Sequence, residues 1–156
     1  MAPRPPHRPR HADLGSRLTR VAKVVAYVVD GDRLLVLLHR DLPLLVTGVQ
    51  VPAGTVRSGE TPEEAVLREV REETGRDCFA VTRALGTAEY AVGPDVHERH
   101  FFALVPTAPL PEEWEAAEEH DGTRPPTAFT LRWIPLADGH VLAAGLGARL
   151  SALTGY

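Results

Sequence analysis

Several residue types are scarce in this 156-residue chain, and each scarcity excludes a class of protein. Cys78 is the only cysteine, so no intramolecular disulfide can form, and we expect a reducing, cytoplasmic setting. No apolar run approaches the roughly 18 residues that a membrane span needs, and the amino terminus lacks the apolar segment of a secretory signal. Lys23 is the only lysine, and this bias toward arginine favours a GC-rich, bacterial coding sequence.

Basic charge is not in excess either. The formal net charge is -4, which argues against a protein that holds duplex nucleic acid by neutralising its phosphates.

The composition and length fit a single domain. Hydrophobic residues make up 44% of the chain, which is enough for a core, and 156 residues are too few for two ordinary domains. We expect residues 1–14, rich in Pro and Arg, to be a disordered tail and residues 15–156 to form one domain.

The segment 54–75 concentrates the chemistry of the chain. Glu69, Glu72 and Glu73 are three and four residues apart, so on a helix they are neighbours. Their mutual repulsion calls for a cation, and Mg²⁺ prefers oxygen ligands of this kind. The alternative interpretation is a solvated acidic face that Arg68 and Arg71 partly neutralise.

Residues typical of helix ends predict a helix within this segment. Thr61 is a suitable N-cap, with Pro62 in the first turn and Glu64 as the acid of a capping box. Gly75 is suited to end the helix as a C′ glycine.

The same segment resembles the signature of the Nudix hydrolase family. The signature reads Gly, five residues, Glu, seven residues, Arg-Glu, an apolar residue, any residue, Glu-Glu, any residue, Gly. Its places are filled in register by Gly54, Glu60, Arg68, Glu69, Val70, Glu72, Glu73 and Gly75. The one departure is Arg76, where the family usually carries an aliphatic residue.

The resemblance implies a fold and a reaction. The fold is an α/β/α sandwich on a mixed β-sheet, of the α/β (α+β) class, over about residues 20–155. The reaction is Mg²⁺-dependent hydrolysis, with Mn²⁺ as an alternative ion, of a diphosphate bond in a nucleoside diphosphate linked to another group. The implied partner is therefore a small nucleotide-type substrate, with no duplex nucleic acid and no membrane, and relatives are often homodimers.

Site residues follow from the same resemblance. Glu69, Glu72 and Glu73 would bind the metal, with the backbone carbonyl of Gly54 or Ala53 as a further ligand. Glu60 and Arg68 would form an ion pair that orients these carboxylates.

The resemblance also implies a general base that takes a proton from the attacking water, either within the helix or on a loop outside it. Glu98 is our leading outside candidate, as base or as additional ligand, and Glu89 is the alternative. The glutamates of residues 112–119 are assigned to a solvated acidic face, namely Glu112, Glu113, Glu115, Glu118 and Glu119.

Substrate contacts are harder to assign. Arg40, Arg57 and Arg99 are candidate phosphate clamps, because a guanidinium grips an oxyanion bidentately. His97 and His100 are three apart on a predicted strand and should point to opposite faces. Trp114 is the least core-like aromatic residue, suited to cover a nucleobase or to contact a second subunit.

Two other functions compete with this one. One is a Nudix-fold module that binds a nucleotide without cleaving it, although such modules typically lose motif carboxylates and this chain retains them. The other is an isomerase of the isopentenyl diphosphate type, which relies on a catalytic cysteine; the only cysteine, Cys78, follows the predicted helix by a few residues, which argues against it. The substrate is also open among ADP-ribose, a nucleotide sugar, a dinucleoside polyphosphate and an oxidised nucleoside triphosphate.

The remaining elements are predicted from pattern and turn residues. Strands are expected at 20–29, 33–38, 49–51, 78–83, 86–92, 97–105 and 129–134, with a loop at 41–48. The segment 106–127 is expected to be a long loop with a helical turn near Trp114, and 141–153 a closing amphipathic helix.

Overall fold

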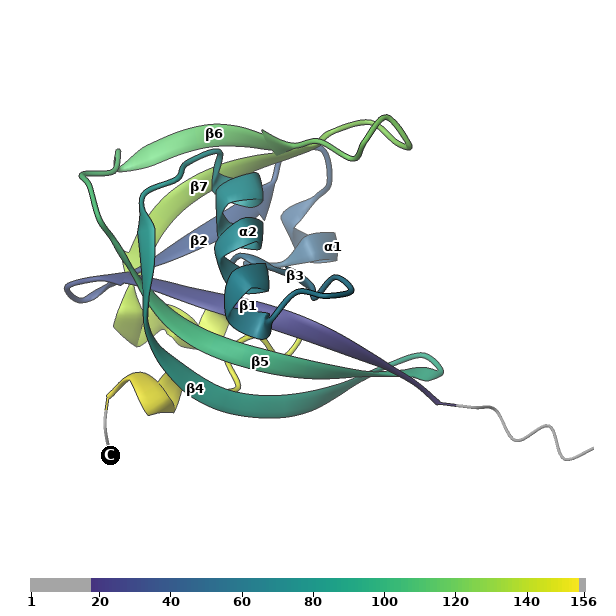
Figure 1. Cartoon of the computed structure of the whole chain (residues 1–156). Coiled ribbons are helices and arrows are strands. Elements are labelled where there is room, and N and C mark those ends of the chain that lie inside the picture. The colour runs from purple at the N-terminus through teal and green to yellow at the C-terminus, as the bar shows by residue number, and fades with distance from the viewer. Residues whose placement is uncertain (1–17, 155–156) are drawn as a thin grey trace, which may run out of the picture.

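The computed structural model describes residues 18–154, and the tail expected at residues 1–14 lies outside this range. A seven-stranded sheet forms the centre (Figure 1). Its strands are β1 (Thr19–Asp30), β2 (Arg33–His39), β3 (Ala53–Thr55), β4 (Phe79–Val92), β5 (Asp95–Pro106), β6 (Glu113–Glu118) and β7 (Thr127–Pro135). The order is β4-β5-β1-β2-β7-β6, and β3 also pairs with β1.

Strand β1 is the branching point of this sheet. Along its length it pairs in parallel with β5, and in antiparallel with β3 and with β2. The remaining pairs are antiparallel, so the predicted mixed sheet is confirmed. The β-branched run in β1 suits this position, because Val24–Val28 is buried on both faces of the sheet.

Each face of the sheet has its own cover. Helix α2 (Pro62–Thr74) lies on the face of Val24, Ala26 and Val28, and packs against it through Ala65, Val66 and Val70. The opposite face carries Val25 and Tyr27, which pack against Leu146 of the C-terminal segment. The hydroxyl of Tyr27 donates to the Leu146 carbonyl at 2.5 Å and fixes that segment to the sheet.

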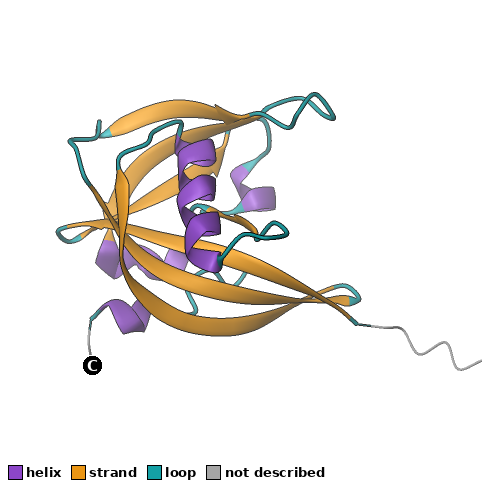
Figure 2. Ribbon diagram, in the orientation of Figure 1, coloured by secondary structure: helices purple, strands orange, loops and turns teal. Residues whose placement is uncertain are grey.

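Strands dominate the structure, and α2 is the longest helix of the described residues (Figure 2). The predicted helix at 141–153 is wrong: that region holds turns between two short 3₁₀ helices, η1 (Leu136–Val141) and η2 (Leu150–Leu153). Ala144 and Gly145 both adopt positive φ, which interrupts a right-handed helix. Within residues 18–154, no helix has the length and the apolar character to cross a bilayer.

Other local predictions also need correction. The expected loop at 41–48 contains a short helix, α1 (Leu44–Thr47). The two strands expected at 78–83 and 86–92 form the single strand β4 (Phe79–Val92), since Gly86 allows a shift of register without ending the strand. Val49 and Gln50 make only isolated bridges, and the strand before α2 begins at Ala53. The helical turn predicted near Trp114 is wrong, because that residue lies in β6.

Candidate functional site

Helix α2 is closed at both ends by the residues expected from the sequence. The Thr61 hydroxyl accepts from the Glu64 amide at 3.1 Å, and the Glu64 carboxylate accepts from the Thr61 amide at 3.4 Å. Gly75 has a φ of 68°, and its amide bonds to the Arg71 carbonyl. The helix therefore holds its carboxylates in a defined frame.

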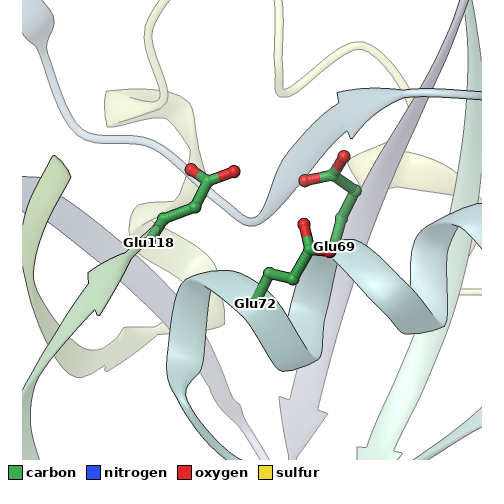
Figure 3. A group of neighbouring side chains, drawn as sticks. All are labelled: Glu69, Glu72 and Glu118. Carbon is green, nitrogen blue, oxygen red and sulfur yellow. The ribbon is translucent and has the colours of Figure 1, made fainter. Parts of the chain in front are cut away.

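Three carboxylates from two elements meet beside this helix. Glu69 and Glu72 project from α2, and Glu118 projects from the end of β6 toward them (Figure 3). One oxygen from each lies within 4.8 Å of the others. This is the donor set that a hard divalent cation prefers.

Glu118 is the residue that the sequence interpretation missed. The sequence predicts a solvated acidic face there, but Glu118 is partly buried and its carboxylate lies with those of Glu69 and Glu72. In β6 the exposed and less exposed positions alternate, and Trp114, Ala116 and Glu118 share the inner side. This period of two was the available signal, and it was hidden because the segment was interpreted as a loop.

Trp114 belongs to the packing of α2. Its indole nitrogen donates to the Thr74 carbonyl at 2.8 Å, and its ring packs against the core. The guanidinium of Arg76, the departure from the family signature, lies 5.3 Å from the Trp114 ring centroid. The aromatic ring thus ties β6 to the end of the helix and helps to place Glu118.

Glu73 lies deeper than the other carboxylates of α2. Only 5% of its surface is exposed, and its Oε1 accepts from the Ala53 amide at 3.0 Å. Burial, with the nearby Glu69 charge, raises the pKa of Glu73 well above its ordinary value. Burial also raises the pKa of Glu69, although Arg68 opposes the shift. The site therefore favours a compensating positive charge, whether a proton or a metal ion.

Arg68 organises the carboxylates around it. Its Nε and Nη2 donate to the two oxygens of Glu60 at 2.7 and 2.9 Å, so the predicted ion pair is present. Its Nη1 donates to Glu69 at 2.8 Å and to Glu72 at 3.2 Å, and its Nη2 also reaches the Thr55 carbonyl. Hydrogen bonding from Arg68 lowers the pKa of Glu60 to about 2. This network fixes the loop before α2 to the helix.

Gly54 provides the space that the Glu69 carboxylate occupies. A Cβ built on Gly54 would come closer than 3.0 Å to Cδ and to both carboxylate oxygens of Glu69. Gly54 is not among the residues with positive φ, so its backbone conformation does not require glycine. Glycine is needed at this position because any side chain would occupy the space of the Glu69 carboxylate.

The three candidate arginines lie in three different places. Arg57 borders the acidic cluster, with Nη2 at 3.6 Å from Glu72. It also lines a cavity of about 590 Å³ together with Glu72, Glu118 and residues of the β6–β7 loop. Arg40 pairs instead with Glu115 on β6 at 3.2 Å. Arg99 lies on the sheet face opposite to α2, beside Tyr90.

Glu98 does not join the three-carboxylate group. It lies on β5, with oxygens at 3.8 Å from Arg20 Nη1 and 3.5 Å from His100 Nε2. Glu89, on the neighbouring strand β4, pairs with Arg20 at 2.8 Å. His97 lines a separate cavity with Arg99, so the two histidines face opposite sides as expected.

Comparison with known proteins agrees with this architecture. A family model described as the NUDIX domain matches residues 19–150. The crystal structure of the MutT protein from Methanosarcina mazei Go1 aligns with a TM-score of 0.63 at 18% identity, over 90% of this chain and 99% of that one. At this identity the likeness shows the fold.

Two curated relatives match over shorter regions. A Caenorhabditis elegans protein with a nudix hydrolase name is 41% identical over 73 residues, which is 46% of this chain and 20% of the relative. The ADP-ribose pyrophosphatase of Bacillus subtilis (strain 168) is 37% identical over 62 residues, which is 40% of this chain and 34% of the relative. The matches thus span about a fifth and a third of these relatives' lengths.

Proposed function

The chain belongs to the NUDIX domain family, and on that premise we propose that it is a Mg²⁺-dependent hydrolase of a diphosphate bond in a nucleoside diphosphate linked to another group. Mn²⁺ is the alternative ion. The observation that carries the proposal is the group formed by Glu69, Glu72 and Glu118, which brings carboxylates from two distant segments together beside Arg68. A solvated acidic helix face would not bury Glu69 and Glu73.

The metal ligands in this proposal are Glu69, Glu72, Glu73 and Glu118, with the backbone carbonyl of Gly54 or Ala53 as a further oxygen. The residues fit a hard cation, because the donors are all oxygens and two of the carboxylates are buried with raised pKa values. When bound, Mg²⁺ neutralises charge on phosphate oxygens and lowers the pKa of water.

The side chains around the ion have separate tasks. Arg68 holds Glu69 and Glu72 in place through its two hydrogen bonds from Nη1. The side chain of Arg57 is 60% exposed and borders the cavity of about 590 Å³, where it is placed to contact phosphate oxygens. As the carboxylate outside the helix, Glu118 is now favoured over Glu98, since Glu118 reaches the group and Glu98 pairs with Arg20 and His100.

The substrate would extend from the carboxylates into the cavity of about 590 Å³. This volume is within the range of about 300–1,000 Å³ typical of small-molecule sites. ADP-ribose is the first compound to test, because the Bacillus relative is named for its hydrolysis. The setting proposed for this activity is a bacterial cytoplasm, on the single cysteine and the arginine bias of the chain.

A paired substitution tests the proposal. Glu73→Gln should lower turnover by orders of magnitude and leave the fold intact, because a glutamine Oε1 still accepts from the Ala53 amide. Glu63→Gln is the matched control, since Glu63 is exposed on the first turn of the same helix. Product release would be followed for ADP-ribose, a nucleotide sugar, a dinucleoside polyphosphate and an oxidised nucleoside triphosphate, each with and without Mg²⁺.

The alternative is a module that binds nucleotides without cleaving them. In that case compounds of the panel bind the wild-type protein and none is hydrolysed in the presence of Mg²⁺. Full activity of Glu73→Gln would instead reject the assigned role of this carboxylate.

A further inference from the structure

A second cavity, of about 210 Å³, lies on the other side of β3 and is lined by two cationic side chains and a histidine. Lys23 on β1 is paired with Arg99 on β5 in the strand register, and His97 is two residues before Arg99. Residues in these positions share a face of the sheet. Lys23, His97 and Arg99 therefore surround one space, which we call the Lys23 pocket; Ala53, Gly54 and Leu146 also line it.

Lys23, Arg99 and His97 lack an acidic partner within the part of the chain that the structure describes. None of them makes a salt bridge at 4.0 Å or less, whereas Arg20, Arg57 and Arg68 each do. Lys23 Nζ instead donates to the Thr55 hydroxyl at 2.6 Å. Arg99 lies 4.2 Å from the Tyr90 ring centroid and donates to the Ala144 carbonyl at 2.5 Å.

Positive charge on Lys23 and His97 is disfavoured in this pocket. Burial lowers the pKa of Lys23, with Arg99 acting in the same direction and Glu69 opposing it. Burial lowers the pKa of His97 as well, and the charges of Lys23 and Arg99 add to this effect. An anion in the pocket would relieve both the repulsion and the desolvation.

The two cavities beside the acidic cluster differ in charge. The larger one contains four carboxylates, Glu72, Glu118, Glu119 and Asp121, alongside Arg57 and Arg124. The Lys23 pocket contains none. An anionic part of a ligand that is not bound to the metal is therefore better accommodated in the smaller cavity.

Size narrows the identity of that ligand group. At about 210 Å³ the pocket is smaller than the range of about 300–1,000 Å³ that accommodates whole drug-sized ligands. It has room for one phosphate group. Gly54 links it to the site, since Gly54 lines the pocket and its Cα also faces the Glu69 carboxylate.

We propose that the Lys23 pocket binds one phosphate group, the terminal phosphate of the substrate, with Lys23, His97 and Arg99 as its ligands. This proposal rests on the proposed function only for the identity of the larger molecule. The Lys23 ammonium and the free edge of the Arg99 guanidinium supply charge-assisted hydrogen bonds. The pocket would thus favour substrates that carry a phosphate beyond the cleaved bond.

The first test measures inorganic phosphate binding to the metal-free protein by calorimetry, with a chelator present. Lys23→Met and His97→Gln should each weaken binding about tenfold or more, as expected for the loss of a charge-assisted hydrogen bond. Lys23→Arg should retain most of the affinity. Arg132→Met, which removes an exposed cation on β7, is the control and should bind as the wild type does. Arg99 is left unchanged because it holds the Ala144 carbonyl.

The proposal is overturned if Lys23→Met and His97→Gln bind phosphate as tightly as the wild type does. It is also overturned if the wild type shows no saturable binding at millimolar phosphate. Because this titration needs no metal and no turnover, it tests phosphate binding in the pocket even if the protein hydrolyses nothing. Conversely, if the wild type hydrolyses a substrate with Mg²⁺ and the two variants bind phosphate unchanged, the proposed function stands and the phosphate site is rejected.

Kinetics then identify the source of the phosphate. With a nucleoside triphosphate as substrate, Lys23→Met should raise KM about tenfold or more, while KM for ADP-ribose, which has no terminal phosphate, should not change. An equal effect on both substrates would contradict the terminal-phosphate assignment and leave free phosphate as the occupant. Mn²⁺ affinity should match the wild type, which excludes an effect of Lys23 through Glu69.

Discussion

Replacing Gly54 by alanine tests whether the space above Glu69 is required by the site. The added Cβ would come closer than 3.0 Å to three atoms of the Glu69 carboxylate, so the carboxylate must move. The backbone itself needs no adjustment, since Gly54 is not in the left-handed region. The perturbation therefore acts on one functional group.

The magnitude follows from what Glu69 would lose. Its Oε1 accepts from Arg68 Nη1 at 2.8 Å in a buried setting, and such a hydrogen bond contributes about 1.5–3 kcal/mol. Overpacking by a methyl group typically adds about 1–3 kcal/mol. We expect Gly54→Ala to lower the free energy of unfolding by about 2–4 kcal/mol. Because a displacement of about 1 Å in a catalytic group can cost about a hundredfold, kcat should fall on that order.

The assays are urea unfolding, Mn²⁺ binding and turnover in the presence of Mg²⁺. Gly31→Ala is the control, because a Cβ there meets nothing within 4 Å and the residue lies in the β1–β2 turn. It should cost stability through its positive φ and leave metal affinity unchanged. The double variant Gly54→Ala/Glu69→Asp has a carboxylate one methylene shorter and should recover part of the lost stability. Wild-type metal affinity and turnover in Gly54→Ala would refute the reasoning.

Three further predictions concern the charged groups. Glu118→Gln should weaken Mn²⁺ binding about tenfold or more while leaving the unfolding transition near that of the wild type, since Glu118 is a proposed ligand at a strand end; unchanged Mn²⁺ affinity would remove Glu118 from the ligand set. Metal affinity should fall as pH is lowered, because the raised pKa values of Glu69 and Glu73 keep protons on the ligands to a higher pH than in ordinary carboxylates. Calorimetry in buffers of different ionisation enthalpy should detect proton release on binding, and its absence would contradict the two pKa shifts. Glu60→Gln should reduce the free energy of unfolding at neutral pH by about 2–3 kcal/mol. Because the pKa of Glu60 is lowered to about 2, its contribution is present above the ordinary carboxyl pKa and is lost as pH falls toward 2; urea unfolding at several pH values should show the variant and the wild type converging in acid.

Local patterns predicted the elements whose structure depends on neighbouring residues. The ends of α2 were identified from Thr61, Pro62 and Gly75, because caps act over three or four residues. The β1–β2 hairpin was identified from its turn and its apolar runs. The Glu60–Arg68 ion pair followed from the family signature, and the structure contains it.

Predictions failed where the environment of a segment decided its conformation. β6 lies in a stretch rich in Pro and Glu, yet its backbone pairs with β7 along its whole length. The C-terminal segment has helical periodicity but is held by contacts to Tyr27 and Arg99, with Ala144 and Gly145 at positive φ. Intrinsic propensity is a weak guide in both cases, because tertiary contacts outweigh it.

The sequence by itself determined that Glu69, Glu72 and Glu73 lie close together on one helix, because the spacing of side chains along a helix is set by covalent geometry. Only the tertiary structure decided that Glu118 completes the group, that Glu73 lies buried against β3, and that Lys23 lies beside Arg99. Those neighbours depend on strand register between segments far apart in the chain. Register is settled when the whole sheet packs, and no short stretch of residues encodes it.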